Sequence, residues 1–215
     1  RGVSSTAVNV LGGANINTIA SNVTGATIGG GGSSDFNGFF TIPNPNTVLD
    51  AFGTVGGGLN NTAGSVATVA GGEGNQASGS HSFIGGGQDN GATNSFATVA
   101  GGELNQASGS HSFIGGGLNN LAAGNSSFAA GNRAKANHDG AFVWADSTIA
   151  DFASTAANQF AIRASGGVVL SGSTPNLSFG NTTRQMLNLW GTQYGIGVQG
   201  YTMYSRAAVG AGFAW

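Results

Sequence analysis

The chain has 215 residues, of which 41 are glycine, and only 7% of its side chains are charged. Globular domains average about 7% glycine and about 25% charged residues, so this is no ordinary globule, while a hydrophobic content of 40% argues against disorder. The net charge of −2 leaves no basic patch for nucleic acid, and without cysteine the chain has no disulfide and no thiolate zinc site. No apolar run is long enough for a membrane-spanning helix.

Residues 1–34 contain two short motifs that look like copies of one repeat, Val10-Leu11-Gly12-Gly13 and Ile28-Gly29-Gly30-Gly31. The next comparable motif starts at Val55, 27 positions after Ile28, so we expect an insertion at residues 35–50 that leaves the repeat as a loop or flap. Loops on a rigid scaffold often carry binding residues. The aromatic residues of this insertion could stack on the sugars of a receptor or pack against an assembly: Phe36, Phe39 and Phe40.

Residues 51–141 repeat a unit of about fifteen residues. Residues 68–82 and 98–112 differ only at Gly74 and Leu104, and the segments between and after them are diverged copies. A β-branched anchor recurs every 14 or 15 residues, at Val55, Val69, Ile84, Val99 and Ile114, with Ala129 as a weaker last member. Glycine disfavours helix by about 1 kcal/mol relative to alanine. The repeat therefore predicts one coil of a β-solenoid, with two short strands per coil.

Equivalent residues of successive coils stack about 4.8 Å apart along a solenoid. The anchors should point inward, together with the residues two positions before them and the alanines eight positions after them. Six positions after each anchor stands an asparagine, at Asn61, Asn75, Asn90, Asn105 and Asn120. We expect this column to form a hydrogen-bonded amide ladder and to occupy a left-handed turn.

The residue just before each anchor should face outward, and this column reads Thr54, Thr68, Phe83, Thr98, Phe113 and Phe128. Phenylalanine is unusual on a solvent face, and the predicted core of alanine, serine, valine and isoleucine is thin. Both features predict that several chains associate along the solenoid, with Phe83, Phe113 and Phe128 at their contacts.

Few residues suggest chemistry. His81 and His111 lie two coils apart in one column with Phe96 between them. In a trimer, three copies of each histidine could converge on the axis and bind an anion or a metal, but we favour a surface or inter-chain hydrogen bond, because metal ligands must converge closely. Glu73 and Glu103 should lie about 10 Å apart on one ridge, whereas glycosidase carboxylates flank a cleft. Contact between chains with Arg133 or Lys135 fits them better. Asp146 and Asp151 could cap the trimer or hold an ion, and we favour the structural cap. We assign no catalytic residue, metal site or cofactor.

Residues 142–215 depart from the repeat and are rich in aromatic residues. Residues 159–165 and 201–207 alternate as strands do, and residues 185–190 fit a strand or a short helical turn. We expect a β-rich neck or an interlocked trimer module here.

The motifs SFIGGGxxNxAxGxxSFA and ATVAGGExNQASGSHSF resemble the head repeats of trimeric autotransporter adhesins. With three glycines and an asparagine in each unit, they are also similar to fibre proteins that end in an endosialidase-type intramolecular chaperone domain. Residues 140–168 resemble the region that follows the repeats in that second group. The resemblance covers most of residues 8–170, and it implies a left-handed parallel β-roll with three chains side by side.

The sequence therefore predicts an all-β fold: a repeat β-solenoid (left-handed parallel β-roll) of about 15-residue coils, homotrimeric, followed by a β-rich neck. The expected function is that of an extracellular fibre or adhesin segment in a phage, an injection system or a bacterial surface. It would form a stiff shaft or head and present a multivalent surface to a glycan or protein receptor. The alternatives are a polysaccharide-cleaving tailspike and an ice- or surface-binding solenoid.

Overall fold

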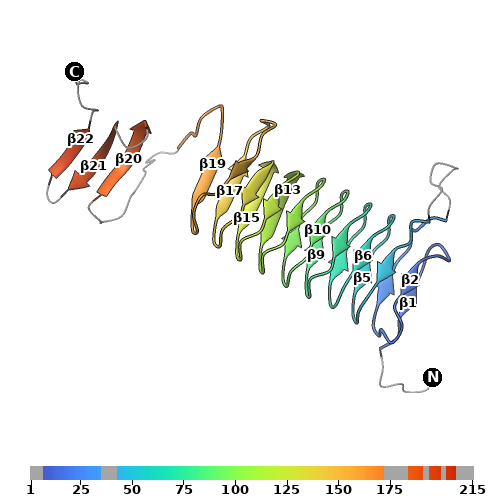
Figure 1. The fold of residues 1–215 in the computed structure, drawn as a ribbon. Coiled ribbons are helices and arrows are strands. Elements are labelled where there is room, and N and C mark those ends of the chain that lie inside the picture. The colour runs from blue at the N-terminus through green and yellow to red at the C-terminus, as the bar shows by residue number, and fades with distance from the viewer. Residues whose placement is uncertain (1–6, 35–42, 172–183, 191–193, 200–201, 207–215) are drawn as a thin grey trace. The chain divides into compact units, whose positions relative to one another are not determined.

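The computed structural model describes residues 7–34, 43–171, 184–190, 194–199 and 202–206. The chain divides into two units, Arg1–Gly166 and Gly167–Trp215, which are taken in turn. All regular secondary structure in the described residues is β-strand (Figure 1).

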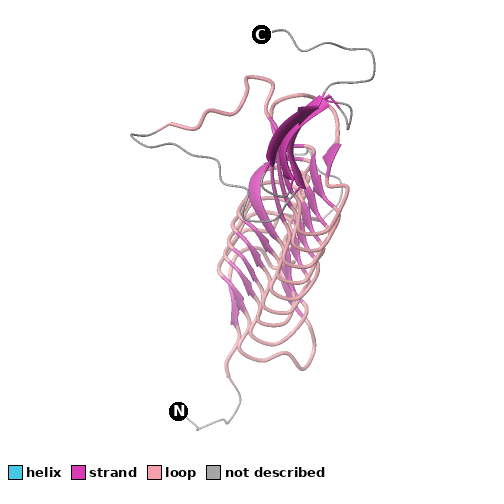
Figure 2. Cartoon of the chain, turned by 90° about the vertical axis from the view of Figure 1, so that its left-hand side faces the viewer, coloured by secondary structure: helices cyan, strands magenta, loops and turns pink. Residues whose placement is uncertain are grey.

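The first unit is a parallel β-solenoid in which each coil before the last strand, β19, contributes one strand to each of two sheets. Figure 2 shows the coils stacked one on the next. The ten-stranded sheet contains β1 (Val10–Leu11), β3 (Thr27–Ile28), β5 (Thr54–Val55), β7 (Thr68–Val69), β9 (Phe83–Ile84), β11 (Thr98–Val99), β13 (Phe113–Leu118), β15 (Phe128–Asn132), β17 (Phe142–Ala145) and β19 (Phe160–Arg163).

The nine-stranded sheet runs along the other side of the coils. Its members are β2 (Thr18–Ile19), β4 (Thr47–Val48), β6 (Thr62–Ala63), β8 (Gln76–Ala77), β10 (Gly91–Ala92), β12 (Gln106–Ala107), β14 (Leu121–Ala122), β16 (Ala134–Ala136) and β18 (Phe152–Ala153). Each strand pairs in parallel with the strand of the same sheet one coil away, which confirms the predicted β-solenoid of about 15-residue coils.

The core is narrow: the coils bury the anchor of the ten-stranded sheet and, two positions earlier, a small residue such as Ala67, Ser82 or Ala97. Register places anchor against anchor, as in Val69 with Ile84 and Val99 with Ile114, and alternation along each strand turns these side chains inward. The anchors are fully buried, and so are the alanines of the second sheet: Val55, Val69, Ile84, Val99, Ile114, Ala63, Ala77, Ala92, Ala107 and Ala122. The largest of these fully buried side chains is isoleucine, so the interior has no room for an aromatic ring.

A buried asparagine ladder runs along one edge of the core and contains Asn61, Asn75, Asn90, Asn105 and Asn120. In a typical step, the backbone N–H of each asparagine donates to the side-chain oxygen of the asparagine one coil before, as from Asn105 to Asn90 at 3.0 Å. Its own side-chain N–H groups donate to glycine carbonyls of its own coil and of the next, Gly101 and Gly117, at 3.1 and 2.9 Å. Asn17 and Asn46 extend the ladder toward the N-terminus.

The left-handed turn lies one residue earlier than the sequence predicted. None of the ladder asparagines has a positive φ, whereas the residue before each does, at Asn60, Gly74, Asp89, Leu104 and Asn119. The reason is that the amide can reach both neighbouring coils only when it points inward from an extended segment. The corner before it therefore makes the bend.

The insertion is shorter than residues 35–50. Asn46 belongs to the ladder, and β4 pairs with β2 and β6, so residues 46–50 form part of a regular coil. Backbone hydrogen bonds between Ser33 and Asn44 join the two ends of the remaining insertion. Phe36, Phe39 and Phe40 lie outside the described residues.

The solenoid also continues beyond residue 141, where a change of module was expected. Strand β17 pairs with β15 and β19, and Val143 and Ala145 are buried like the anchors before them. Only the coil length changes, because residues 146–151 form a loop between β17 and β18. In the second unit, β20 (Arg184–Trp190), β21 (Tyr194–Gln199) and β22 (Thr202–Arg206) form an antiparallel sheet, so residues 185–190 are a strand.

The asparagine ladder can be tested with Asn105→Ala. This change removes four side-chain hydrogen bonds and leaves the buried N–H of Asn120 without its acceptor. Each buried polar group left unpaired costs about 1–3 kcal/mol, so we expect the free energy of unfolding in urea to fall by about 3 kcal/mol. The neighbouring Gln106→Ala removes an exposed side chain and should change it by less than about 0.5 kcal/mol. Equal effects of the two changes would contradict a structural role for the ladder.

Candidate functional site

The outward face of the ten-stranded sheet carries a column of phenylalanine and threonine. We call Phe83, Phe113, Phe128, Phe142 and Phe160 the Phe column. Its last four rings stack face to face, with centroids 5.5, 4.4 and 4.7 Å apart. Phe83 is 41% exposed and Phe113 is 38% exposed, so the rings line the surface rather than the core. Thr98 interrupts the column between them.

The next outward column is made of very small residues, so the face is nearly flat. It reads Gly56, Ala70, Gly85, Ala100, Gly115 and Ala130 before it reaches Trp144. No charged residue stands in either outward column between Thr54 and Trp144. A partner that covered this surface would bury apolar area, and no charged side chain of these two columns would be removed from water.

His81, Phe96 and His111 form a second stack at a corner of the coils. Their ring centroids are 5.0 and 4.8 Å apart, and all three residues have a left-handed backbone with φ near +60°. Each histidine Nδ1 hydrogen bonds to the hydroxyl of the preceding serine. The two imidazoles lie on opposite faces of Phe96, so within one chain they cannot bind the same ion.

The carboxylates of the shaft do not form a cleft. Glu73 and Glu103 are both exposed, and Gln88 bridges them in the same column. Across the described residues, no group of three or more histidine, aspartate or glutamate side chains could hold a metal ion. The outward threonine column of the ten-stranded sheet is interrupted at Phe83 and Phe113, so it does not form the regular threonine array of an ice-binding surface.

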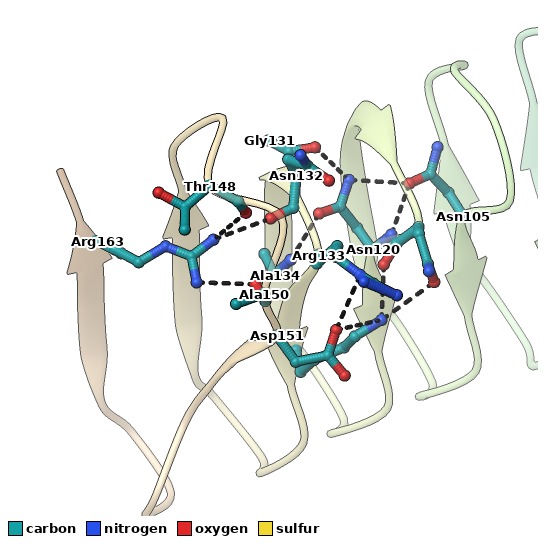
Figure 3. A network of polar contacts seen from close by, with 12 residues as sticks. Asn105, Asn120, Gly131, Asn132, Arg133, Ala134, Thr148, Ala150, Asp151 and Arg163 are labelled. Carbon is teal, nitrogen blue, oxygen red and sulfur yellow. Dashed lines mark hydrogen bonds and ion pairs between the residues drawn. The ribbon is translucent and has the colours of Figure 1, made fainter. Parts of the chain in front are cut away.

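A polar cluster secures the coil that contains the 146–151 loop (Figure 3). The Arg163 guanidinium pairs with Asp146 at 3.0 Å and donates to the backbone carbonyls of Thr148 and Ala150. Arg133 pairs with Asp151 at 3.2 Å. The sequence analysis did not identify these partners, because the 146–151 loop changes the number of residues between them. Asp146 and Asp151 both pair with arginines of the same chain.

Hydrogen bonds hold the pKa of Asp146 well below its ordinary value. The largest contribution comes from the backbone N–H of Ser165, followed by hydrogen bonds from Thr148. The side chain is only 11% exposed, so the ionised carboxylate is part of the folded structure.

Beside Trp144 lies an open hollow of about 500 Å³, lined mainly by apolar atoms. It is bordered by Gly117, Leu118, Gly131, Asn132, Ala145, Asp146 and Ser147. The hollow is shallow and lies where the coils change length, so it adds shape to an otherwise flat surface.

Comparison with protein-family models and with curated proteins found no match to this chain. The described residues contain no helix that is long and apolar enough to cross a membrane.

The role of Asp146 predicts a specific response to acid. A carboxylate whose pKa is lower in the folded state stabilises the fold fully above its ordinary pKa of 3.8, and this stabilisation is lost as the pH falls below that value. Asp146→Asn should therefore lower the urea midpoint at neutral pH, and the difference from wild type should shrink below pH 3.8. Asp89→Asn removes the same charge from an exposed corner and corrects for net charge. A difference that does not vary with pH would contradict this role.

Proposed function

We propose that this chain is a segment of a homotrimeric extracellular fibre or adhesin, in which three solenoids pack side by side through the face that carries the Phe column. The observation that carries the proposal is the placement of aromatic rings on the outside of a solenoid whose own core holds none among its described residues.

The distribution of apolar area supports association. Fully burying a phenylalanine side chain contributes about 1.5–3 kcal/mol, and the single chain leaves Phe83 and Phe113 more than a third exposed. The small side chains beside the Phe column let a neighbouring chain approach closely, and extended exposed apolar surfaces mark interaction sites.

The distribution of charge supports the same face. From residue 7 to residue 132 the described chain contains no lysine or arginine, and its acids Asp50, Glu73, Asp89 and Glu103 lie away from the outward columns of the ten-stranded sheet. Burial of that face therefore removes no charge from water. Three copies of this face would meet about an axis along the solenoid.

A trimer of this kind provides stiff spacing and repeated presentation. The insertion between Ser33 and Asn44 would appear three times, so weak contacts to a cell-surface glycan or protein would combine. Phage tail fibres, injection-system fibres and bacterial surface fibres all use such segments. The proposed role requires no catalytic residue.

The proposal predicts the mass of the native particle. Light scattering should give about three times the 21.0 kDa of one chain. The double variant Phe113→Glu/Phe128→Glu should reduce this to the mass of one chain or cause loss of folded protein, because it places charges in the contact. Gln106→Glu puts a charge on the exposed side of the nine-stranded sheet and should leave the trimer intact. A wild-type monomer with an intact β signal in circular dichroism would overturn the proposal.

A further inference from the structure

The amine of Lys135 lies against the side chain of Asn119, one coil away. Strand β16 pairs with β14, which sets Lys135 beside Leu121, and the lysine side chain reaches back to the corner that precedes the ladder. Its Nζ donates to the backbone oxygen of Asn119 at 2.6 Å and lies 3.2 Å from the side-chain oxygen Oδ1. Only 15% of the lysine side chain is exposed. A nucleophile thus sits beside a carboxamide in a sheltered position.

A carboxylate completes the group. Asp151, on the loop between β17 and β18, places Oδ1 4.0 Å from the Lys135 Nζ, and the same oxygen is held by Arg133 at 3.2 Å (Figure 3). Asn119 itself is fixed by its left-handed backbone, with φ of 55°. Three groups that an acyl-transfer step needs are therefore together: an amine, an acyl group and a proton carrier.

The surroundings favour a reactive amine. Burial lowers the pKa of Lys135, Asp151 opposes this effect, and the neighbouring Arg133 cation adds to it, so that the net direction is downward. A lower pKa increases the fraction of neutral, nucleophilic amine at a given pH. The short contact to the Asn119 backbone oxygen keeps the amine next to its target while it is neutral or charged.

We propose that Lys135 and Asn119 form an intramolecular isopeptide bond, with Asp151 as the proton carrier. The neutral Nζ attacks the Asn119 side-chain carbonyl carbon, and a bond forms between Nζ and that carbon. The Asp151 carboxylate accepts the proton that Nζ loses and delivers it to the departing Asn119 Nδ2. The bond from carbon to Nδ2 breaks, and one molecule of ammonia leaves. No oxidant or other reactant is consumed.

Such a bond would tie the coil of β14 to the coil of β16 near the place where the solenoid changes coil length. The chain has no cysteine, so a disulfide cannot do this. All of these contacts lie within one chain, so the bond does not depend on the proposed trimer.

The test is the mass of the purified full chain, measured after denaturation. The expected mass is lower than the sequence mass by one ammonia, and tandem mass spectrometry of a protease digest should find a branched peptide that joins residues 119 and 135. Trypsin should no longer cleave after Lys135. Folding of every sample is checked by its β signal in circular dichroism before denaturation.

Three variants separate the bond from other losses of ammonia. Lys135→Arg keeps the cation and its hydrogen-bond donors but should restore the full mass, as should Asn119→Ala. Asp151→Asn should abolish or strongly slow the loss. A succinimide at Asn119 would lose the same mass, but it would persist in Lys135→Arg and give no branched peptide. Folded wild-type chain with the full sequence mass, or with an ammonia loss that Lys135→Arg retains, would overturn the proposal.

Discussion

The buried asparagine ladder is the constraint on which the rest of the solenoid depends. Each amide bonds to the coil before it and the coil after it, so a coil that shifted by one residue would leave several buried polar groups unpaired at about 1–3 kcal/mol each. Coils that keep the ladder must keep nearly the same length. Additional residues stand where they do not interrupt the ladder, between Ser33 and Asn44 and at residues 146–151.

The narrow core, filled only by small and β-branched side chains and the ladder asparagines, determines where aromatic residues can stand. Because small and β-branched side chains fill the space between the sheets, the aromatic residues of the repeat lie outside the core, either in the Phe column or at the corner that holds His81, Phe96 and His111. Stacking between neighbouring rings stabilises them partly within the chain, at about 0.5–1.5 kcal/mol for each aromatic pair. The remaining exposed area is the structural basis for proposing a second and a third chain.

The sequence predicted the period, the anchors and the buried asparagines because each leaves a column that can be counted at fixed spacing. It failed where loops change that spacing. Asn46-Thr47-Val48 repeats the pattern of Asn61-Thr62-Ala63 and would have placed residues 46–50 in a coil. The spacing between the anchors Ile28 and Val55 is irregular, however, so this repeat was assigned to the insertion. Phe142 and Val143 likewise continue the alternation of Phe128 and Ala129. The contacts of Arg163 and Lys135 could not be predicted, because they cross coils of unequal length.

The ion pairs at the end of the solenoid follow from the end of the ladder. Asn120 makes the last ladder step, since its Oδ1 accepts from the backbone of Ala134, and alanine has no amide with which to continue. The following coil carries the 146–151 loop, whose backbone carbonyls need other donors. Arg163 supplies them at Thr148 and Ala150 and also donates to the carbonyl of Asn132 in β15, with its charge balanced by Asp146. Where the coils no longer have a common length, a guanidinium therefore donates the hydrogen bonds that a ladder amide donates elsewhere. This need for donors explains why the Arg and Lys residues in the described part of the first unit all lie at this end, namely Arg133, Lys135 and Arg163.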